Sequence, residues 1–313
     1  MLAALALPAS FNRAGRGPVT NLRSLSRRCS MTTSASSAEQ PASLSDWPAA
    51  FDNSFVRELR AEPPDAPPHA SRQVFGAHYT RVRPTVTAPK PTLVAWSASV
   101  AESLGLQAAE CESEEFLAIF GGSPPESYEC WATAYGASFT GQYGGQRGDG
   151  RAISIGQRSG LEVQLKGAGV TPYSRQFDGR AVLRSSVREF LAQEAMGALR
   201  VPTSRSLCVV ATGELIMRQW YDDQGLERVM KEPGAVGTRV APSFLRFGQM
   251  ELFYQRSETE LLRELAEHAL EREFSHIAAT DAPLSQKLVL MFGEICQRQA
   301  TLVSEWLRVG YCQ

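Results

Sequence analysis

Three features in the middle of the chain could together bind a phosphorylated ligand. Glycine is concentrated in the segment 144–151, which reads Gly-Gly-Gln-Arg-Gly-Asp-Gly-Arg. Two short apolar segments follow, the second of which ends at Lys166, and Glu189 comes later in a helical pattern. Glycine lets backbone N–H groups approach a phosphate closely. A lysine adds a positive charge, and a glutamate can hold that lysine in place.

This order of parts is that of the nucleotide-binding lobe of protein kinases. Each part alone has an ordinary explanation: a glycine-rich turn, a solvated lysine on a strand, and a glutamate that caps a helix three residues after Ser186. Their order and spacing together favour nucleotide binding. The sequence has no His-Arg-Asp or Asp-Phe-Gly motif, which argues against a conventional kinase.

Two predicted hairpins flank a predicted helix and would position these residues. Residues 151–166 are predicted to form the first hairpin, with its turn at 157–160, because apolar and polar residues alternate in its second arm. The second hairpin is predicted at 206–219, around a turn at Thr212-Gly213. Between the hairpins, the spacing of Leu183, Val187, Phe190, Leu191, Ala195 and Ala198 predicts a helix over 182–199.

Helical patterns also occupy both sides of this strand-rich middle. Helices are predicted at 93–104 and 113–120, and then at 258–274 and 285–308 near the end of the sequence. Strands and helices are therefore segregated along the chain, and the sequence predicts an α+β fold.

Long sequence blocks in the same region closely resemble the selenoprotein O family. The densest are 166–175 (Lys-Gly-Ala-Gly-Val-Thr-Pro-Tyr-Ser-Arg) and 178–195, which begins Asp-Gly-Arg-Ala-Val-Leu-Arg-Ser-Ser. The resemblance covers roughly residues 50–313, and its other blocks are 51–55, 79–84, 200–210, 232–236 and 239–248.

The resemblance implies a protein-kinase-like fold that binds ATP in an inverted orientation. It implies transfer of AMP from ATP to Ser, Thr or Tyr hydroxyls of protein substrates, with Mg²⁺ or Mn²⁺ as the metal. On this basis residues 39–130 are an N-terminal extension of the family domain and 131–248 the complete, strand-rich nucleotide-binding lobe. Residues 249–313 then supply only the first helices of the helical lobe.

The family's nucleotide-binding positions carry over to eight residues of this sequence. Glu189 matches the ion-pair partner of the phosphate-binding lysine. The positions that match ATP contacts are Gly148, Gly150, Arg151, Lys166, Asp178, Gly179, Arg239 and Arg246.

Two departures from the family pattern bear on function. A His-Gln-Phe triplet before the glycine-rich loop is replaced by Ser138, Phe139 and Thr140. The general base and the metal-binding Asn and Asp of the family lie beyond Gln313, so the sequence is expected to be truncated before them and to contain no catalytic residue or metal ligand. The alternative interpretation is a catalytically inert, pseudokinase-like regulatory module that binds nucleotide.

Composition and charge narrow the class of partner and predict a location. The net charge of −1 gives no sign of nucleic-acid binding. No apolar run approaches the length that spans a bilayer, so no membrane partner is expected. Residues 1–38 contain five Arg, seven Ser and no Asp or Glu. This pattern predicts a transit peptide and a mitochondrial location, with a plastid as the alternative.

Overall fold

The computed structural model describes residues 44–139, 141–221 and 224–312. The predicted transit peptide at 1–38 lies outside these residues, as does Thr140. The described part has a mixed α+β fold built on an antiparallel sheet, which confirms the predicted class.

The main sheet of the described residues has eight strands. Its order is β1-β3-β6-β7-β10-β9-β2, and β8 pairs with β10. Two of these strands, β1 and β2, come from the segment before residue 131. The strands are β1 (Tyr79–Arg81), β2 (Thr92–Trp96), β3 (Trp131–Thr133), β6 (Ala152–Arg158), β7 (Leu161–Lys166), β8 (Ala181–Val182), β9 (Arg205–Tyr221) and β10 (Glu227–Ala241), and a separate pair joins β4 (Gly136–Phe139) to β5 (Gln142–Gln146).

The hairpin that delivers Lys166 is confirmed. Strands β6 and β7 pair in antiparallel fashion, and Ser159 and Gly160 at their turn have φ angles of 53° and 73°. Two successive residues with positive φ match the right-handed twist of the strands on either side. The next strand in the sheet is β10, in which Gly237 lies opposite Lys166.

The prediction of a second hairpin is wrong, because the chain does not turn at Thr212-Gly213. Strand β9 continues through Thr212-Gly213 and pairs with β10 along almost its whole length. Ala211 pairs with Ala235 and Leu215 pairs with Pro233, so the residues between them form a bulge. Gly213 absorbs the distortion with a φ of 82°. A Thr-Gly pair that locally favours a turn is therefore accommodated as a bulge, because a long partner strand satisfies the backbone on both sides of it.

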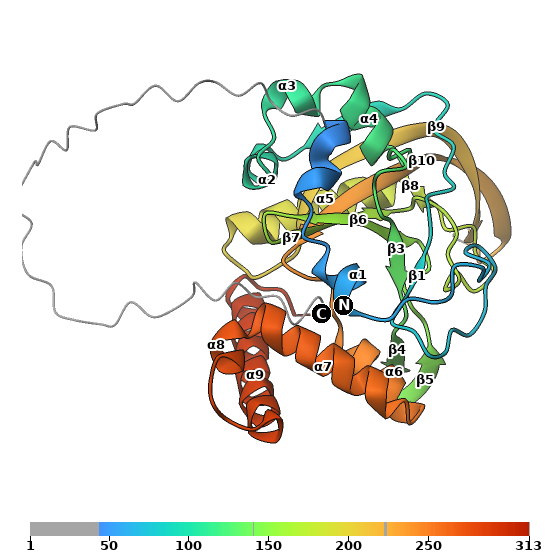
Figure 1. The fold of residues 1–313 in the computed structure, drawn as a ribbon. Helices are drawn as coiled ribbons and strands as arrows, with labels where there is room; N and C mark the ends of the chain where they lie inside the picture. The colour runs from blue at the N-terminus through green and yellow to red at the C-terminus, as the bar shows by residue number, and fades with distance from the viewer. Residues whose placement is uncertain (1–43, 140, 222–223, 313) are drawn as a thin grey trace, which may run out of the picture.

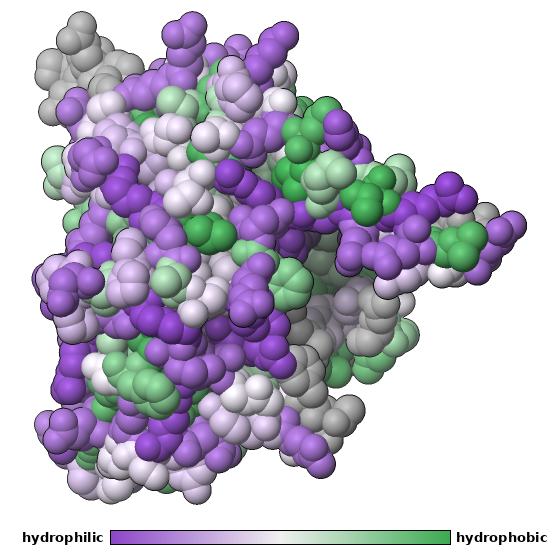
Figure 2. All heavy atoms as spheres, turned by 90° about the vertical axis from the view of Figure 1, so that its right-hand side faces the viewer, coloured by the Kyte–Doolittle hydropathy of each residue, from purple (hydrophilic) through white to green (hydrophobic). Residues whose placement is uncertain are grey.

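Beyond the bulge, β9 and β10 continue as a two-stranded arm with an apolar face. Figure 2 shows an arm projecting from the body of the molecule, with hydrophobic atoms along it. Leu215, Met217, Tyr221 and Val229 lie on one face of the strand pair and are 63%, 55%, 65% and 59% exposed.

Most predicted helices are confirmed. Helix α5 (Leu183–Ala198) lies against β9 and β10, and α4 (Glu114–Phe120) is capped by the Ser113 side chain. Near the end of the sequence come α7 (Thr259–Glu273) and α9 (Leu284–Arg308). The remaining helices are η1 (Leu44–Ala50), α1 (Ser54–Glu58), α2 (Ala98–Ser103), α3 (Ala108–Cys111), α6 (Phe247–Gln255) and α8 (Ser275–Ala278).

Two details of the helix predictions are wrong. The predicted helix at 93–104 is divided into β2 and α2, because Thr92–Trp96 pairs with the edge of β9. In α5, Leu191 of the predicted apolar stripe is 60% exposed, whereas Ser186 is buried. This helix therefore packs on the sheet through a different face from the one that its apolar spacing indicates.

One hydrophobic core joins the sheet to the helices on its two sides. In Figure 1, α7, α8 and α9 lie below the sheet and α2, α3 and α4 lie above it. A single cluster of mutually packed, buried side chains includes residues from Leu44 near the start of the described chain to Ile295 in α9. Phe55 of α1 illustrates the connection, since its ring lies 5.7 Å from those of both Tyr79 in β1 and His268 in α7. No helix among the described residues is long and apolar enough to cross a membrane.

Candidate functional site

A cavity of about 1060 Å³ lies beside the β7–β10 pair and α5. Its wall takes residues from the loop before β6, the end of β7, the segment 174–180, helix α5, strands β9 and β10 and the segment 244–246, together with Tyr135 and Ser204. Every predicted nucleotide-binding residue lines it, as does Glu189. These residues are Gly148, Gly150, Arg151, Lys166, Asp178, Gly179, Arg239 and Arg246. Their binding of ATP stays a prediction.

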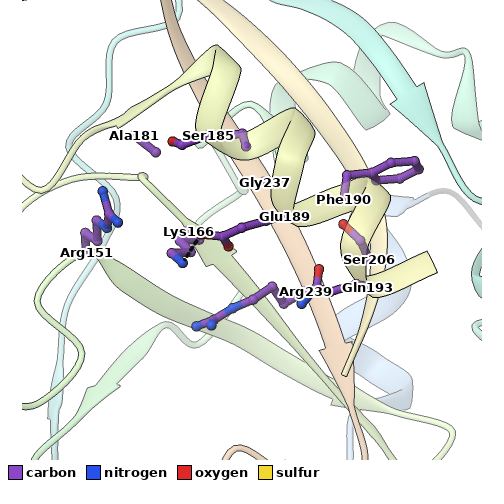
Figure 3. A pocket seen from close by; sticks show the side chains of 11 residues that line it. Arg151, Lys166, Ala181, Ser185, Glu189, Phe190, Gln193, Ser206, Gly237 and Arg239 are labelled. Carbon is purple, nitrogen blue, oxygen red and sulfur yellow. Dashed lines mark hydrogen bonds and ion pairs between the residues drawn. The ribbon is translucent and has the colours of Figure 1, made fainter. Parts of the chain in front are cut away.

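Lys166 and Glu189 form an ion pair at the wall of the cavity. The Lys166 Nζ lies 2.5 Å from Glu189 Oε1, and the two side chains are 21% and 39% exposed. Figure 3 shows them pointing toward each other from β7 and α5. Burial and the charge of Arg239 lower the pKa of Lys166 to about 8, although Glu189 acts in the opposite direction. The lysine is thus a cation that is close to losing its proton.

Arg239 lies next to this pair on β10. One Nη donates a hydrogen bond to Gln164 Oε1, and the guanidinium lies 5.3 Å from the centre of the Phe244 ring. Burial, together with the charge of Arg246, lowers the pKa of Arg239. Its Nε is buried and has no hydrogen-bond partner among the described residues. A half-buried guanidinium whose Nε lacks a partner is suited to binding an anion.

Asp149 and Tyr135 hold Arg246 at the edge of the cavity. The guanidinium lies 3.4 Å from Asp149 Oδ1 and 4.6 Å from the centre of the Tyr135 ring. Asp149 is 2% exposed, and its Oδ2 accepts hydrogen bonds from the backbone N–H and the hydroxyl of Thr133. Sequence reasoning did not single out Asp149 as a site residue. The available signal was its position as the one acid within the glycine-rich segment.

Packing against Tyr173 explains why two loop positions are glycine. A Cβ on Gly148 would lie 2.4 Å from Tyr173 Cγ, and one on Gly150 would lie 2.7 Å from the Tyr173 carbonyl oxygen. Gly148 also has a φ of 87°. The loop that lines the cavity is shorter than the predicted segment 144–151, because its first residues belong to β5. Close packing, in addition to any approach of a phosphate, therefore requires glycine here.

Asp178, which also lines the cavity, is held by an arginine that the sequence analysis missed. Arg218 of β9 donates to both oxygens of Asp178, at 2.6 and 3.1 Å. Burial opposes the ionisation of Asp178, but the hydrogen bonds from Arg218 and from the Arg180 backbone outweigh it and lower the pKa of this carboxyl. The adjacent Gly179 has a φ of 67°, and a Cβ there would lie 2.1 Å from the Gly169 carbonyl oxygen. The Asp178 carboxylate is therefore already occupied by protein donors.

The cavity as a whole is basic. Seven basic and three acidic side chains line it, and each of the three acids, Asp149, Asp178 and Glu189, is paired with a base. Three of the bases, Arg175, Arg180 and Arg218, were not predicted. Arg175 and Arg180 lie within the sequence blocks that carry the family resemblance, whereas nothing in the local sequence marks Arg218. Such an excess of positive charge around a cavity favours an anionic ligand.

The described residues do not by themselves fit a protein-held divalent metal. Throughout the ranges that the structure describes, no group of three His, Cys, Asp or Glu side chains is arranged to hold a metal ion. The three acids of the cavity are engaged by Lys166, Arg218 and Arg246. No chemical step is therefore assigned to a metal bound by these residues.

An α+β fold in which a strand lysine and a helix glutamate meet beside a basic cavity is that of a kinase-like protein. A sequence model described as "Protein adenylyltransferase SelO" matches residues 69–313. The chain belongs to this family.

Bacterial relatives agree with this membership. The chain is 47% identical over 270 residues to "Protein nucleotidyltransferase YdiU" of Azoarcus sp. (strain BH72), covering 84% of this chain and 50% of the relative. It is 45% identical over 267 residues to the protein of the same name from Xanthomonas campestris pv. campestris (strain B100), covering 83% of this chain and 50% of the relative. The chain spans about half the length of the curated relatives it matches.

These relatives overturn the predicted location. The similar proteins are bacterial, and a further one, 45% identical over 266 residues, comes from Tolumonas auensis. These bacterial relatives give no support to a mitochondrion or a plastid, so the prediction of an organelle location is wrong. The prediction rested on the Arg-rich, Ser-rich composition of residues 1–38, which is not specific to transit peptides.

Proposed function

We propose that this chain binds ATP in the basic cavity and that its activity is the transfer of AMP to Ser, Thr or Tyr hydroxyls of other proteins. One observation carries the first half of the proposal: all eight positions that match the family's ATP contacts, together with Glu189, line the same cavity. The family description and the names of the relatives support the second half.

The arrangement of charge suits this reaction. A protein hydroxyl oxygen attacks the α-phosphorus and loses its proton, the bond from that phosphorus to the α–β bridging oxygen breaks, and pyrophosphate leaves. Negative charge develops on the leaving group, and cations fixed nearby stabilise it. Lys166, Arg239 and Arg246 are held by contacts within the protein and can act in this way without first being ordered.

Calorimetric titration of the full chain with ATP tests the binding step. Lys166→Ala removes a largely buried cation beside the phosphates, which we expect to cost about 1.5–3 kcal/mol of binding free energy, or roughly a 10- to 150-fold rise in Kd. Lys90→Ala is the matched control, because Lys90 is exposed and does not line the cavity. Equal Kd values for the wild type and Lys166→Ala would remove Lys166 from the site.

The position of the label in ATP tests the transfer step. Because no general base or metal ligand is expected in this sequence, transfer by this chain should be slow. Any label that does become attached to an acceptor protein should come from the α-phosphate and not from the γ-phosphate. Transfer of the γ-label would make the protein a kinase. Binding of ATP with transfer of neither label would agree both with the expected lack of a general base and with the alternative function, a nucleotide-binding regulatory module. Transfer of the α-label would contradict that alternative.

A further inference from the structure

The turn that follows Tyr173 carries a cation to which no role has so far been assigned. Arg175 lines the cavity together with the glycine-rich loop, and its side chain is exposed. It forms no ion pair with any carboxylate of the described residues, and its guanidinium lies 5.6 Å from the centre of the Phe177 ring. Arg180 and Arg218, the other two unpredicted bases, are instead paired with Glu214 and Asp178.

Arg175 resembles two of the predicted phosphate-binding residues in having no acidic partner. Arg151 and Arg239 likewise form no ion pair with a carboxylate in the described part of the chain, whereas Lys166 and Arg246 each have one. A cation that faces a cavity without a counter-charge attracts an anionic ligand more strongly than a neutralised one.

The backbone at Arg175 is held in an unfavourable conformation. Arg175 and Gln176 have φ angles of 54° and 69°, and two consecutive non-glycine residues with left-handed backbone are uncommon. Two hydrogen bonds maintain the turn: the Gln176 N–H donates to Ser71 Oγ at 3.1 Å, and the Phe177 N–H donates to the Ser174 carbonyl oxygen at 3.0 Å. Strain of this kind is concentrated at ligand-binding sites, where the surrounding structure fixes the side chain in place.

The same turn is joined directly to the glycine-rich loop. Ser174 Oγ donates to the Gly150 carbonyl oxygen at 2.5 Å, and Thr171 Oγ1 donates to the Asp149 carbonyl oxygen at 2.8 Å. The Thr171 N–H in turn donates to Ser174 Oγ at 2.9 Å. The backbone that carries Arg175 therefore has a fixed position relative to the loop.

We infer that Arg175 is a further phosphate-binding residue of this site. It supplies a planar, permanently charged group to the polyphosphate of the nucleotide and, by the same contact, to pyrophosphate. The inference rests on the proposed function, since it assigns Arg175 to the ligand proposed for the cavity. It adds a contact made by the segment 171–176, which the proposed set of ATP contacts leaves out.

Calorimetry on the full chain with ATP, pyrophosphate and adenosine as separate probes tests the assignment. Arg175→Asn removes the charge and keeps a residue that tolerates left-handed backbone. We expect Kd to rise about tenfold for ATP and for pyrophosphate and to stay unchanged for adenosine, a modest factor because the side chain is exposed to solvent. Gln176→Asn is the matched control, because it alters the neighbouring left-handed position without removing a charge, and Arg175→Lys should restore most of the affinity.

The outcomes separate this inference from the proposed function. Loss of affinity in Lys166→Ala but wild-type affinity for pyrophosphate in Arg175→Asn would overturn the role of Arg175 and leave the proposed function standing. An equal loss in Gln176→Asn would also overturn it, because the turn would then matter for its shape and not for its charge. Failure of the wild-type chain to bind either ATP or pyrophosphate would refute both proposals.

Discussion

The low pKa of Lys166 predicts that affinity for ATP depends on pH above neutrality. In the free chain Lys166 loses its proton as pH rises through about 8. The phosphates of ATP favour the protonated lysine, so binding raises its pKa back toward that of an ordinary lysine, about 10.4. The affinity should therefore be complete below pH 8 and should fall as pH rises above it.

The size of the effect follows from this pKa. One proton linked to binding changes the affinity by at most a factor of ten for each pH unit. A free-state pKa of about 8 and a bound-state pKa near 10 give about a tenfold loss of affinity between pH 7 and pH 9. Tyr135 does not add to the change, because burial, together with the charge of Asp149, raises the pKa of its phenol above the usual value of 10.0.

Calorimetric titrations with ATP at pH 7, 8 and 9 measure this dependence. Lys166→Ala provides the control, since its affinity should be weak at every pH and should not vary across this range. A wild-type affinity that is constant from pH 7 to pH 9 would refute the reasoning, as would an equally steep decline in Lys166→Ala. Either result would mean that Lys166 does not exchange its proton in response to the ligand.

Two further predictions concern stability. In urea unfolding, Gly148→Ala should lower the free energy of unfolding by about 1–3 kcal/mol more than Gly160→Ala does. Both glycines have positive φ, but only at position 148 would the new methyl group meet Tyr173. Equal losses in the two variants would contradict this packing. Burial lowers the pKa of His78 and of His268, so as pH falls the unfolded chain protonates these histidines before the folded chain does. The two histidines therefore do not reduce stability above about pH 6.5, and the free energy of unfolding falls as pH drops below that value. Replacing both by Gln should make unfolding free energy less sensitive to pH between 5 and 7 than in the wild type, and an unchanged slope would show that the two histidines do not titrate on unfolding.

The site residues that the sequence could identify lie within continuous motifs. Lys166 ends a strand with clear alternation, and Glu189 lies in a helix with clear periodicity, so order and spacing were enough to predict that they meet. Asp149, Tyr135 and Arg218 were missed because each acts through a partner distant in sequence, and such partners are brought close only by folding.

The sequence by itself determined the class of fold, the β6–β7 hairpin, the boundaries of α5, α7 and α9, and the family, because each depends on a local periodicity or on a continuous block of residues. Tertiary structure alone decided that Thr212-Gly213 is a bulge and that Thr92–Trp96 is a strand, since in both places a neighbouring strand supplies the hydrogen bonds that override local preference. It also decided why Gly148 and Gly150 are glycines and why Arg175 faces the cavity. Those answers depend on how closely the turn at Tyr173 approaches the loop before β6, and neither segment carries a sequence pattern that records the contact.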